Sequence, residues 1–66
     1  MFNSEEELVE YYERLSESKG LLFEGLSYED PEKDMDCGYA FAFDVENDCS
    51  LPIGEFAVRD GYYYAL

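Results

Sequence analysis

Carboxylates are the side chains of this sequence best suited to chemistry. The chain of 66 residues holds 17 Asp and Glu against 4 Lys and Arg, with no His, for a formal net charge of −13. Carboxylates act as general acids and bases, as oxygen ligands for cations, or as fixed negative charge facing a basic partner. Their spacing, and the residues around them, decide among these three roles.

The sequence offers few residues suited to catalysis. Without histidine the commonest general base is missing, and neither a Ser-His nor a Cys-His nucleophile pair can form. A glycosidase-type carboxylate pair needs a deep cleft, and a chain this short has little volume in which to form one. We therefore expect no enzyme activity and assign no catalytic residue.

One window partly matches a calcium-binding loop. Its ligand positions hold Asp44, Glu46, Asp48, Ser50 and Glu55. Cys49 stands where such a loop needs glycine, and the flanking segments read as strands where helices are required. Zinc is favoured even less than calcium, because Cys37 and Cys49 without histidine do not supply a closed tetrahedral ligand set. We expect no metal and no cofactor.

The cysteine count and the apolar pattern bear on location. Two cysteines are too few for a secreted disulfide scaffold, which favours free thiols, although pairing of Cys37 with Cys49 stays open. No apolar run is long enough to span a bilayer, and the first residues lack the basic and apolar regions of a signal peptide. We expect a cytoplasmic protein that avoids membranes.

The remaining role, fixed charge, depends on a helix near the N-terminus. Asn3 and Ser4 are both good N-caps, and each has a glutamate three residues later. An apolar stripe at helical spacing follows, formed by Leu8, Tyr11, Tyr12 and Leu15. Gly20 provides the stop signal. The pattern predicts a helix from about Ser4 to Lys19, with either Tyr11 or Tyr12 in the core.

Four segments have strand character. They are Leu21–Tyr28, with a bulge or bend expected at Gly25, then Gly38–Glu46, Ile53–Arg59 and Tyr62–Leu66. The segment 47–52 is expected to connect the second strand to the third. The fold class is therefore α+β, a single domain over residues 1–66 in which one N-terminal helix packs on a three- to four-stranded antiparallel sheet.

The segment Gly38–Glu46 alternates bulky with small or charged residues. Tyr39, Phe41 and Phe43 fall on one face, whereas Ala40 and Ala42 fall on the other. The bulky face is the one expected to be covered, so Tyr39 is assigned to the core.

Asp60-Gly61 is a strong signal for a two-residue hairpin. The register that it implies pairs Val58 with Tyr63 and leaves Tyr62 and Tyr64 on the face away from the helix. Aromatic residues exposed at a sheet edge are typical of protein interfaces.

The acids repeat along the predicted helix. Glu6, Glu10, Glu13 and Glu17 fall on the face opposite the apolar stripe and span about 16 Å at ~1.5 Å per residue. Duplex DNA carries one charge per roughly 3.4 Å of each strand, which is a comparable density. The excess of 13 negative charges also exceeds the roughly 2 to 8 that solubility requires of a small domain.

In size, acidity, lack of histidine and helix-plus-sheet pattern, the chain resembles the small phage-encoded DNA-mimic inhibitors, including anti-CRISPR and anti-restriction proteins. The residues that match the phosphate role are Glu6, Glu10, Glu13, Glu17, Glu29, Asp30, Glu32, Asp34 and Asp36. The resemblance implies a non-enzymatic inhibitor in the host bacterial cytosol. It would bind a basic DNA-binding protein or complex, such as a CRISPR-Cas effector, and block target-DNA recognition without touching nucleic acid itself.

A second interpretation stays open. In it the chain is an acidic protein-protein interaction module that binds through its C-terminal tyrosine-rich edge, with Tyr62 and Tyr64 as the contact residues. The negative charge then serves solubility alone.

Overall fold

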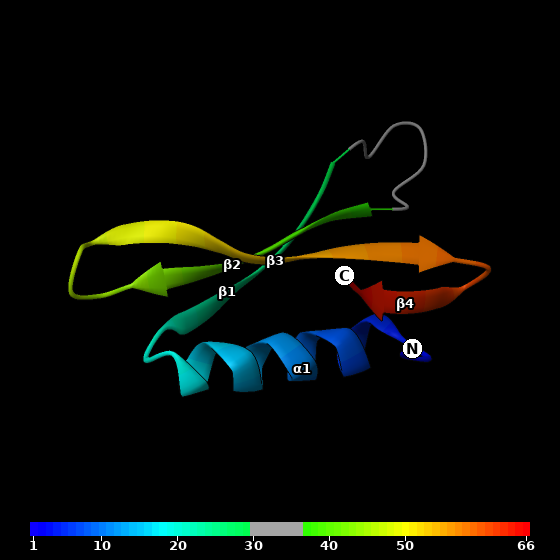
Figure 1. Ribbon diagram of the computed structural model, residues 1–66, viewed down its shortest axis with the longest axis horizontal. Helices are drawn as coiled ribbons and strands as arrows, with labels where there is room; N and C mark the ends of the chain where they lie inside the picture. The colour runs from blue at the N-terminus through cyan, green and yellow to red at the C-terminus, as the bar shows by residue number, and fades with distance from the viewer. Residues whose placement is uncertain (30–36) are drawn as a thin grey trace.

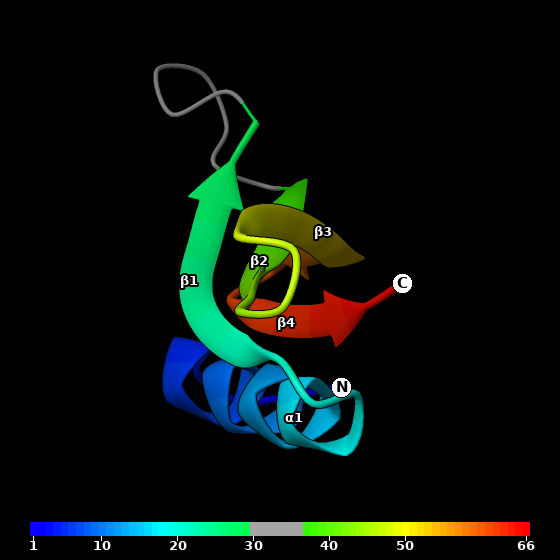
Figure 2. The same cartoon turned by 90° about the vertical axis from the view of Figure 1, so that its left-hand side faces the viewer.

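A computed structural model describes residues 1–29 and 37–66 and confirms the α+β class. One helix packs against a four-stranded antiparallel sheet with the strand order β1-β2-β3-β4, so each strand pairs with the next in sequence. Figures 1 and 2 show the helix as a layer along one side of a strongly twisted sheet. The elements are α1 (Glu5–Ser18), β1 (Leu22–Tyr28), β2 (Cys37–Asp44), β3 (Cys49–Arg59) and β4 (Tyr62–Ala65).

Both ends of α1 carry the predicted signals. Ser4 is the N-cap, and its side-chain oxygen accepts a hydrogen bond from the Glu7 backbone N–H at 3.3 Å. At the other end, Gly20 has a φ of 74°, which favours glycine, and the Leu21 N–H reaches the Ser16 carbonyl at 2.9 Å. This is a Schellman motif, and it turns the chain directly into β1.

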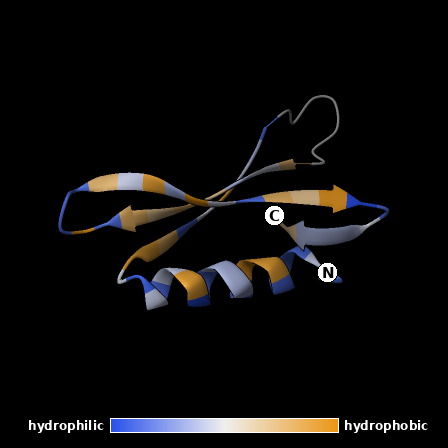
Figure 3. Cartoon of the chain, in the orientation of Figure 1, coloured by the Kyte–Doolittle hydropathy of each residue, from blue (hydrophilic) through white to orange (hydrophobic). Residues whose placement is uncertain are grey.

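The apolar stripe of α1 is narrower than predicted. Leu8 and Tyr12 are buried and Leu15 is half-buried, whereas Tyr11 keeps 42% of its surface exposed. Figure 3 shows the apolar bands of α1 alternating with hydrophilic ones, as expected for a helix with one buried side. Of the two tyrosines, it is Tyr12 that enters the core.

The predicted orientation of β2 is wrong. Ala40 and Ala42 are fully buried on the side of α1, whereas Tyr39 is 36% exposed on the opposite side. Small residues let the helix approach the sheet closely, and large helix residues such as Leu8 and Tyr12 then fill the space between the layers. Residue size along the strand therefore did not indicate which face was covered.

Two glycines allow close contacts, Gly38 between the strands β1 and β2 and Gly54 between the sheet and the helix. A Cβ at Gly38 would lie 2.1 Å from the Ser27 carbonyl oxygen, and one at Gly54 would lie 2.8 Å from the Tyr12 ring. The hydroxyl of Tyr12 crosses above Gly54 and donates a hydrogen bond of 2.7 Å to the Glu55 carbonyl. Sheet and helix are thus joined where the strand has no side chain.

The strand β3 begins at Cys49, four residues earlier than predicted, so most of the expected connection 47–52 belongs to a strand. Pro52 lies within β3, opposite Phe41, beside a register shift at Ala40/Phe41. A bulge tolerates a proline because a ladder hydrogen bond is already interrupted there. The bulge predicted in β1 is confirmed, since the register shifts between Phe23 and Gly25.

The last hairpin forms as predicted. Val58 pairs with Tyr63, Phe56 with Ala65 and Arg59 with Tyr62, around the turn at Asp60-Gly61. The free edge of β4 is partly closed by Phe2, which exchanges backbone hydrogen bonds of 2.7 and 2.9 Å with Tyr63. The N-terminus therefore lies beside the end of the chain (Figure 1).

Candidate acidic interface

Four glutamates form a continuous strip on α1, which we call the acidic strip: Glu6, Glu10, Glu13 and Glu17. All four side chains are exposed and lie on the side of the helix away from Leu8 and Tyr12. Their spacing of three and four residues sets them along one helix face, as the sequence predicts. None of them takes part in the core, so their carboxylates are available to a partner.

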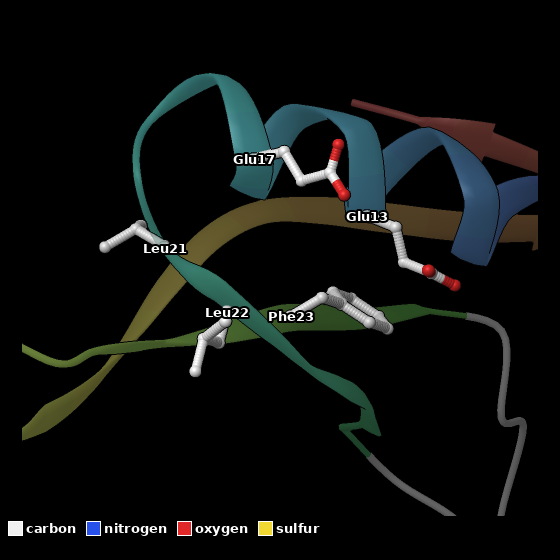
Figure 4. A pocket seen from close by; sticks show the side chains of 5 residues that line it. All are labelled: Glu13, Glu17, Leu21, Leu22 and Phe23. Atoms are coloured by element: carbon white, nitrogen blue, oxygen red, sulfur yellow. The ribbon is translucent and has the colours of Figure 1, made fainter.

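The strip borders two shallow hollows, and Glu13 lines both. The first hollow lies between α1 and the start of β1, has a volume of about 360 Å³, and is lined by Glu13, Glu17, Leu21, Leu22 and Phe23. Figure 4 shows the Glu13 and Glu17 carboxylates projecting from α1 near the ring of Phe23. This hollow combines negative charge with apolar surface, which suits the aliphatic stem and cationic head of a lysine or arginine.

The second hollow, of about 230 Å³, continues the strip toward the helix N-terminus. It is lined by Glu5, Glu6, Val9, Glu10 and Glu13. Sequence reasoning missed both Glu5 and the apolar residues of β1 as neighbours of the strip, because their position depends on how β1 packs beside α1.

A hydrogen bond between β1 and α1 holds one end of this region. The Tyr28 hydroxyl donates to the Glu5 carboxylate at 2.6 Å. Burial of the ring raises the pKa of Tyr28 above its usual value near 10, and the bond to Glu5 raises it further. The phenol therefore stays protonated to a higher pH than an ordinary tyrosine, and it links the first turn of the helix to the sheet.

The acidic segment after β1 falls mostly outside the described residues. Asp30, Glu32, Asp34 and Asp36 lie there, so the structure does not bear on their predicted role. Glu29 is described and exposed, and its carboxylate accepts a hydrogen bond from the Cys37 thiol at 3.2 Å. Glu29 thus lies at the junction of β1 and β2, separate from the lining of both hollows.

The C-terminal tyrosines lie as predicted on the side of the sheet away from α1. Tyr62 is 41% exposed and Tyr64 is half-buried. Tyr64 lines a third hollow together with Ala57, Arg59, Ala65 and Leu66. The acidic strip and this edge therefore belong to opposite sides of the molecule.

The acidic turn between β2 and β3 is stabilised by its own side chains. The Asp44 carboxylate accepts hydrogen bonds from the backbone N–H groups of Glu46 and Asn47 and from the Asn47 amide at 2.6 Å. These bonds, the Asn47 amide first, lower the pKa of Asp44 below its usual value. Within residues 1–29 and 37–66, no group of three His, Cys, Asp or Glu side chains is placed to hold a metal ion.

Cys49 is a half-buried free thiol, and the Cys37 thiol donates to Glu29, so the expectation of thiols is confirmed. In the described part of the chain, no helix is long and apolar enough to cross a membrane.

The fold defines the chain as a small α+β domain, a helix on an antiparallel meander. Comparisons of the chain with protein-family profiles, with curated proteins and with solved structures found no match. Its functional interpretation is therefore based on its own residues.

Proposed function

We propose that this protein is a non-enzymatic inhibitor whose carboxylates take the place of DNA phosphates on a basic DNA-binding surface. One observation carries the proposal, the acidic strip of four exposed glutamates along one face of a single helix. A helix with both ends capped holds the backbone of the strip in place, so on binding only the glutamate side chains lose conformational freedom. Like charges at this spacing weaken an isolated helix, so its own stability does not account for the strip.

The partner is a cationic protein or complex that binds duplex DNA. Its lysines and arginines would form charge-assisted hydrogen bonds with the strip, and their aliphatic stems would contact the apolar residues of the first hollow, Leu22 and Phe23. A CRISPR-Cas effector that must engage target DNA has this kind of surface, and on that basis we propose it as the finer assignment. In this role the protein works in the cytosol of a bacterial host.

The partner can be identified by capture from a bacterial lysate at low salt with the wild-type protein. Duplex DNA binding by the retained complex is then measured by fluorescence anisotropy with increasing inhibitor, and we expect the inhibitor to displace DNA. Direct binding of the inhibitor to the complex, measured without DNA, should weaken at least ~10-fold when salt rises from ~50 to ~500 mM, because screening weakens exposed charge pairs.

Charge reversal provides the decisive variant. Glu10→Lys with Glu13→Lys should reduce potency by ~10-fold or more, since two phosphate substitutes become cations. The matched control, Glu46→Lys with Glu55→Lys, changes the net charge equally at exposed sites away from the strip and should keep most of the potency. Equal losses in both variants would mean that net charge, and not the strip, is responsible.

The second candidate function is the acidic interaction module that binds through the tyrosine edge. The exposure of Tyr62 beside a hollow lined by Tyr64 and Arg59 favours it. In that case, Tyr62→Ser with Tyr64→Ser should abolish capture of the partner, and reversal of Glu10 and Glu13 should leave capture unchanged.

A further inference from the structure

The sheet has a side that no described element covers, and we call it the open face. In the register of the strands, its central row runs along β2 through Tyr39, Phe41 and Phe43. Apolar neighbours on β3 and β4 extend this row: Pro52, Tyr62 and Tyr64. Tyr39 is 36% and Tyr62 is 41% exposed, and the rings of Tyr39 and Phe41 lie 6.5 Å apart, so aromatic groups are presented side by side.

The open face carries few of the charges of the described residues. Glu55 and Arg59 lie there by register, Glu24 lies at the bulge of β1, and Glu29 lies at one end beside Cys37. The helix on the other side holds six glutamates, three in its first turn and three beyond. Within residues 1–29 and 37–66, the negative charge is therefore concentrated on the helix side and away from the aromatic row.

We propose that the open face is the contact surface between two copies of this chain. An acidic protein repels its own copy, and the repulsion is least where the approaching surfaces have few charges. Stacked sheets lie about 10 Å apart, so two copies joined by their open faces keep their acidic helices on the outer sides of the dimer. The helices are then separated by well over the ~8 Å Debye length at physiological salt.

The size of the face sets the strength of the contact. The four strands hold 7, 8, 11 and 4 residues, and at ~3.3 Å per residue and ~4.8 Å between strands they cover roughly 475 Å². This is less than the ~800 Å² that each partner contributes to a standard interface, so we expect a weak, reversible dimer. A short peptide would cover only part of this face, whereas an identical sheet covers all of it.

Charge complementarity favours one arrangement of the copies. Arg59 lies at one end of β3, and the acidic turn with Glu46 and Asp48 precedes the other end. A two-fold axis in the plane of contact and across the strands would place Arg59 of each copy near the acidic turn of its partner. The same axis brings the Tyr39 and Phe41 rows together at the centre, where buried aromatic residues contribute most. It also brings the Glu55 side chains of the two copies, which lie beside Tyr39, toward each other.

The test is sedimentation equilibrium of the purified chain from low micromolar to millimolar concentration, at ~50 and ~500 mM salt. We expect a monomer-dimer equilibrium that shifts toward dimer as salt rises, because screening reduces the repulsion between like-charged copies. Binding of the proposed basic partner should weaken under the same change. The two salt dependences have opposite signs, so dimerisation and DNA mimicry can fail independently of each other.

Tyr39→Ser with Phe41→Ser should raise the dimer Kd by ~10-fold or more. Tyr11→Ser is the matched control, because Tyr11 is similarly exposed but lies on the helix side. If circular dichroism shows that the double variant is unfolded, Tyr39→Glu alone provides the same test at an exposed position of the open face. A monomer throughout these conditions, or a dimer weakened by Tyr11→Ser and not by the open-face variants, would overturn the proposal.

Discussion

The two sides of the sheet differ in the size of the side chains that β2 contributes to them. On the covered side, β2 contributes Ala40 and Ala42, and the volume comes from the large side chains of α1 that lie above them. On the open side the same strand presents Tyr39 and Phe41, with no described element above them. The difference teaches that burial here follows from how closely two backbones approach, and not from which face has the larger side chains.

The largest expected effect comes from crowding two neighbouring strands, β1 and β2, at the covered side. Gly38→Ala should destabilise the fold by ~3 kcal/mol or more, because the new Cβ would meet the Ser27 carbonyl oxygen, which is backbone and cannot rotate away. Urea unfolding followed by circular dichroism measures the loss.

Gly61→Ala is the comparator for that variant. A Cβ at Gly61 meets nothing within 4 Å, but its φ of 82° strains any other residue by roughly 1–2 kcal/mol. A Gly38→Ala variant that lost no more stability than Gly61→Ala would show that β1 does not pack against β2 so tightly.

A pair of leucine variants compares the layer between helix and sheet with the exposed edge of the sheet. Leu8→Ala should cost ~2–5 kcal/mol, since Leu8 is fully buried between helix and sheet and its removal leaves a cavity. Leu22→Ala, on the edge strand β1 and 60% exposed, should stay within about 0.5 kcal/mol of the wild type. The free energies of unfolding are compared at concentrations where the wild type is monomeric. Equal losses would mean that Leu8 is not packed between helix and sheet.

Local signals in the sequence predicted most of the fold. The capping pattern at Ser4, the glycine stop at Gly20 and the hairpin at Asp60-Gly61 each act within a few residues, and each forms in the structure. The strand register that follows from the hairpin also placed Tyr62 and Tyr64 on the correct side.

The sidedness of β2 could not be derived in the same way. Alternation defines two faces but does not say which one the helix covers, and size misled because both faces are apolar. A usable signal was present, since Gly38, Ala40 and Ala42 form a row of small residues along one face of the strand. A row of small residues is equally consistent with a second layer packed closely on that face and with a face that nothing covers.

The candidate interface could also be predicted only in part. The exposure of Glu6, Glu10, Glu13 and Glu17 followed from helical spacing, and the structure agrees. The hollow beside them depends on the course of the chain after α1, where the Schellman motif brings Leu21 and the first residues of β1 next to Glu13 and Glu17. The residues of the helix alone therefore do not predict this hollow.

The smallest expected effect comes from the hydrogen bond between β1 and the helix, in which the Tyr28 hydroxyl donates to the Glu5 carboxylate. Folding raises the pKa of Tyr28 above its usual value near 10, through burial first and the bond to Glu5 second. The folded state therefore holds this proton more tightly than the unfolded chain. Its contribution to stability is complete below pH 10 and is lost as the pH rises above 10.

Tyr28→Phe should therefore lose less stability than the wild type as the pH rises above 10. Urea unfolding at several alkaline pH values measures both profiles, and the difference between them is the contribution of the Tyr28 hydroxyl. A smaller slope should remain, because burial also raises the pKa of Tyr12. Glu5→Gln removes the charge but keeps an acceptor, so its profile should fall between those of wild type and Tyr28→Phe. A Tyr28→Phe profile parallel to the wild type would mean that β1 and the first turn of α1 are not joined through this phenol.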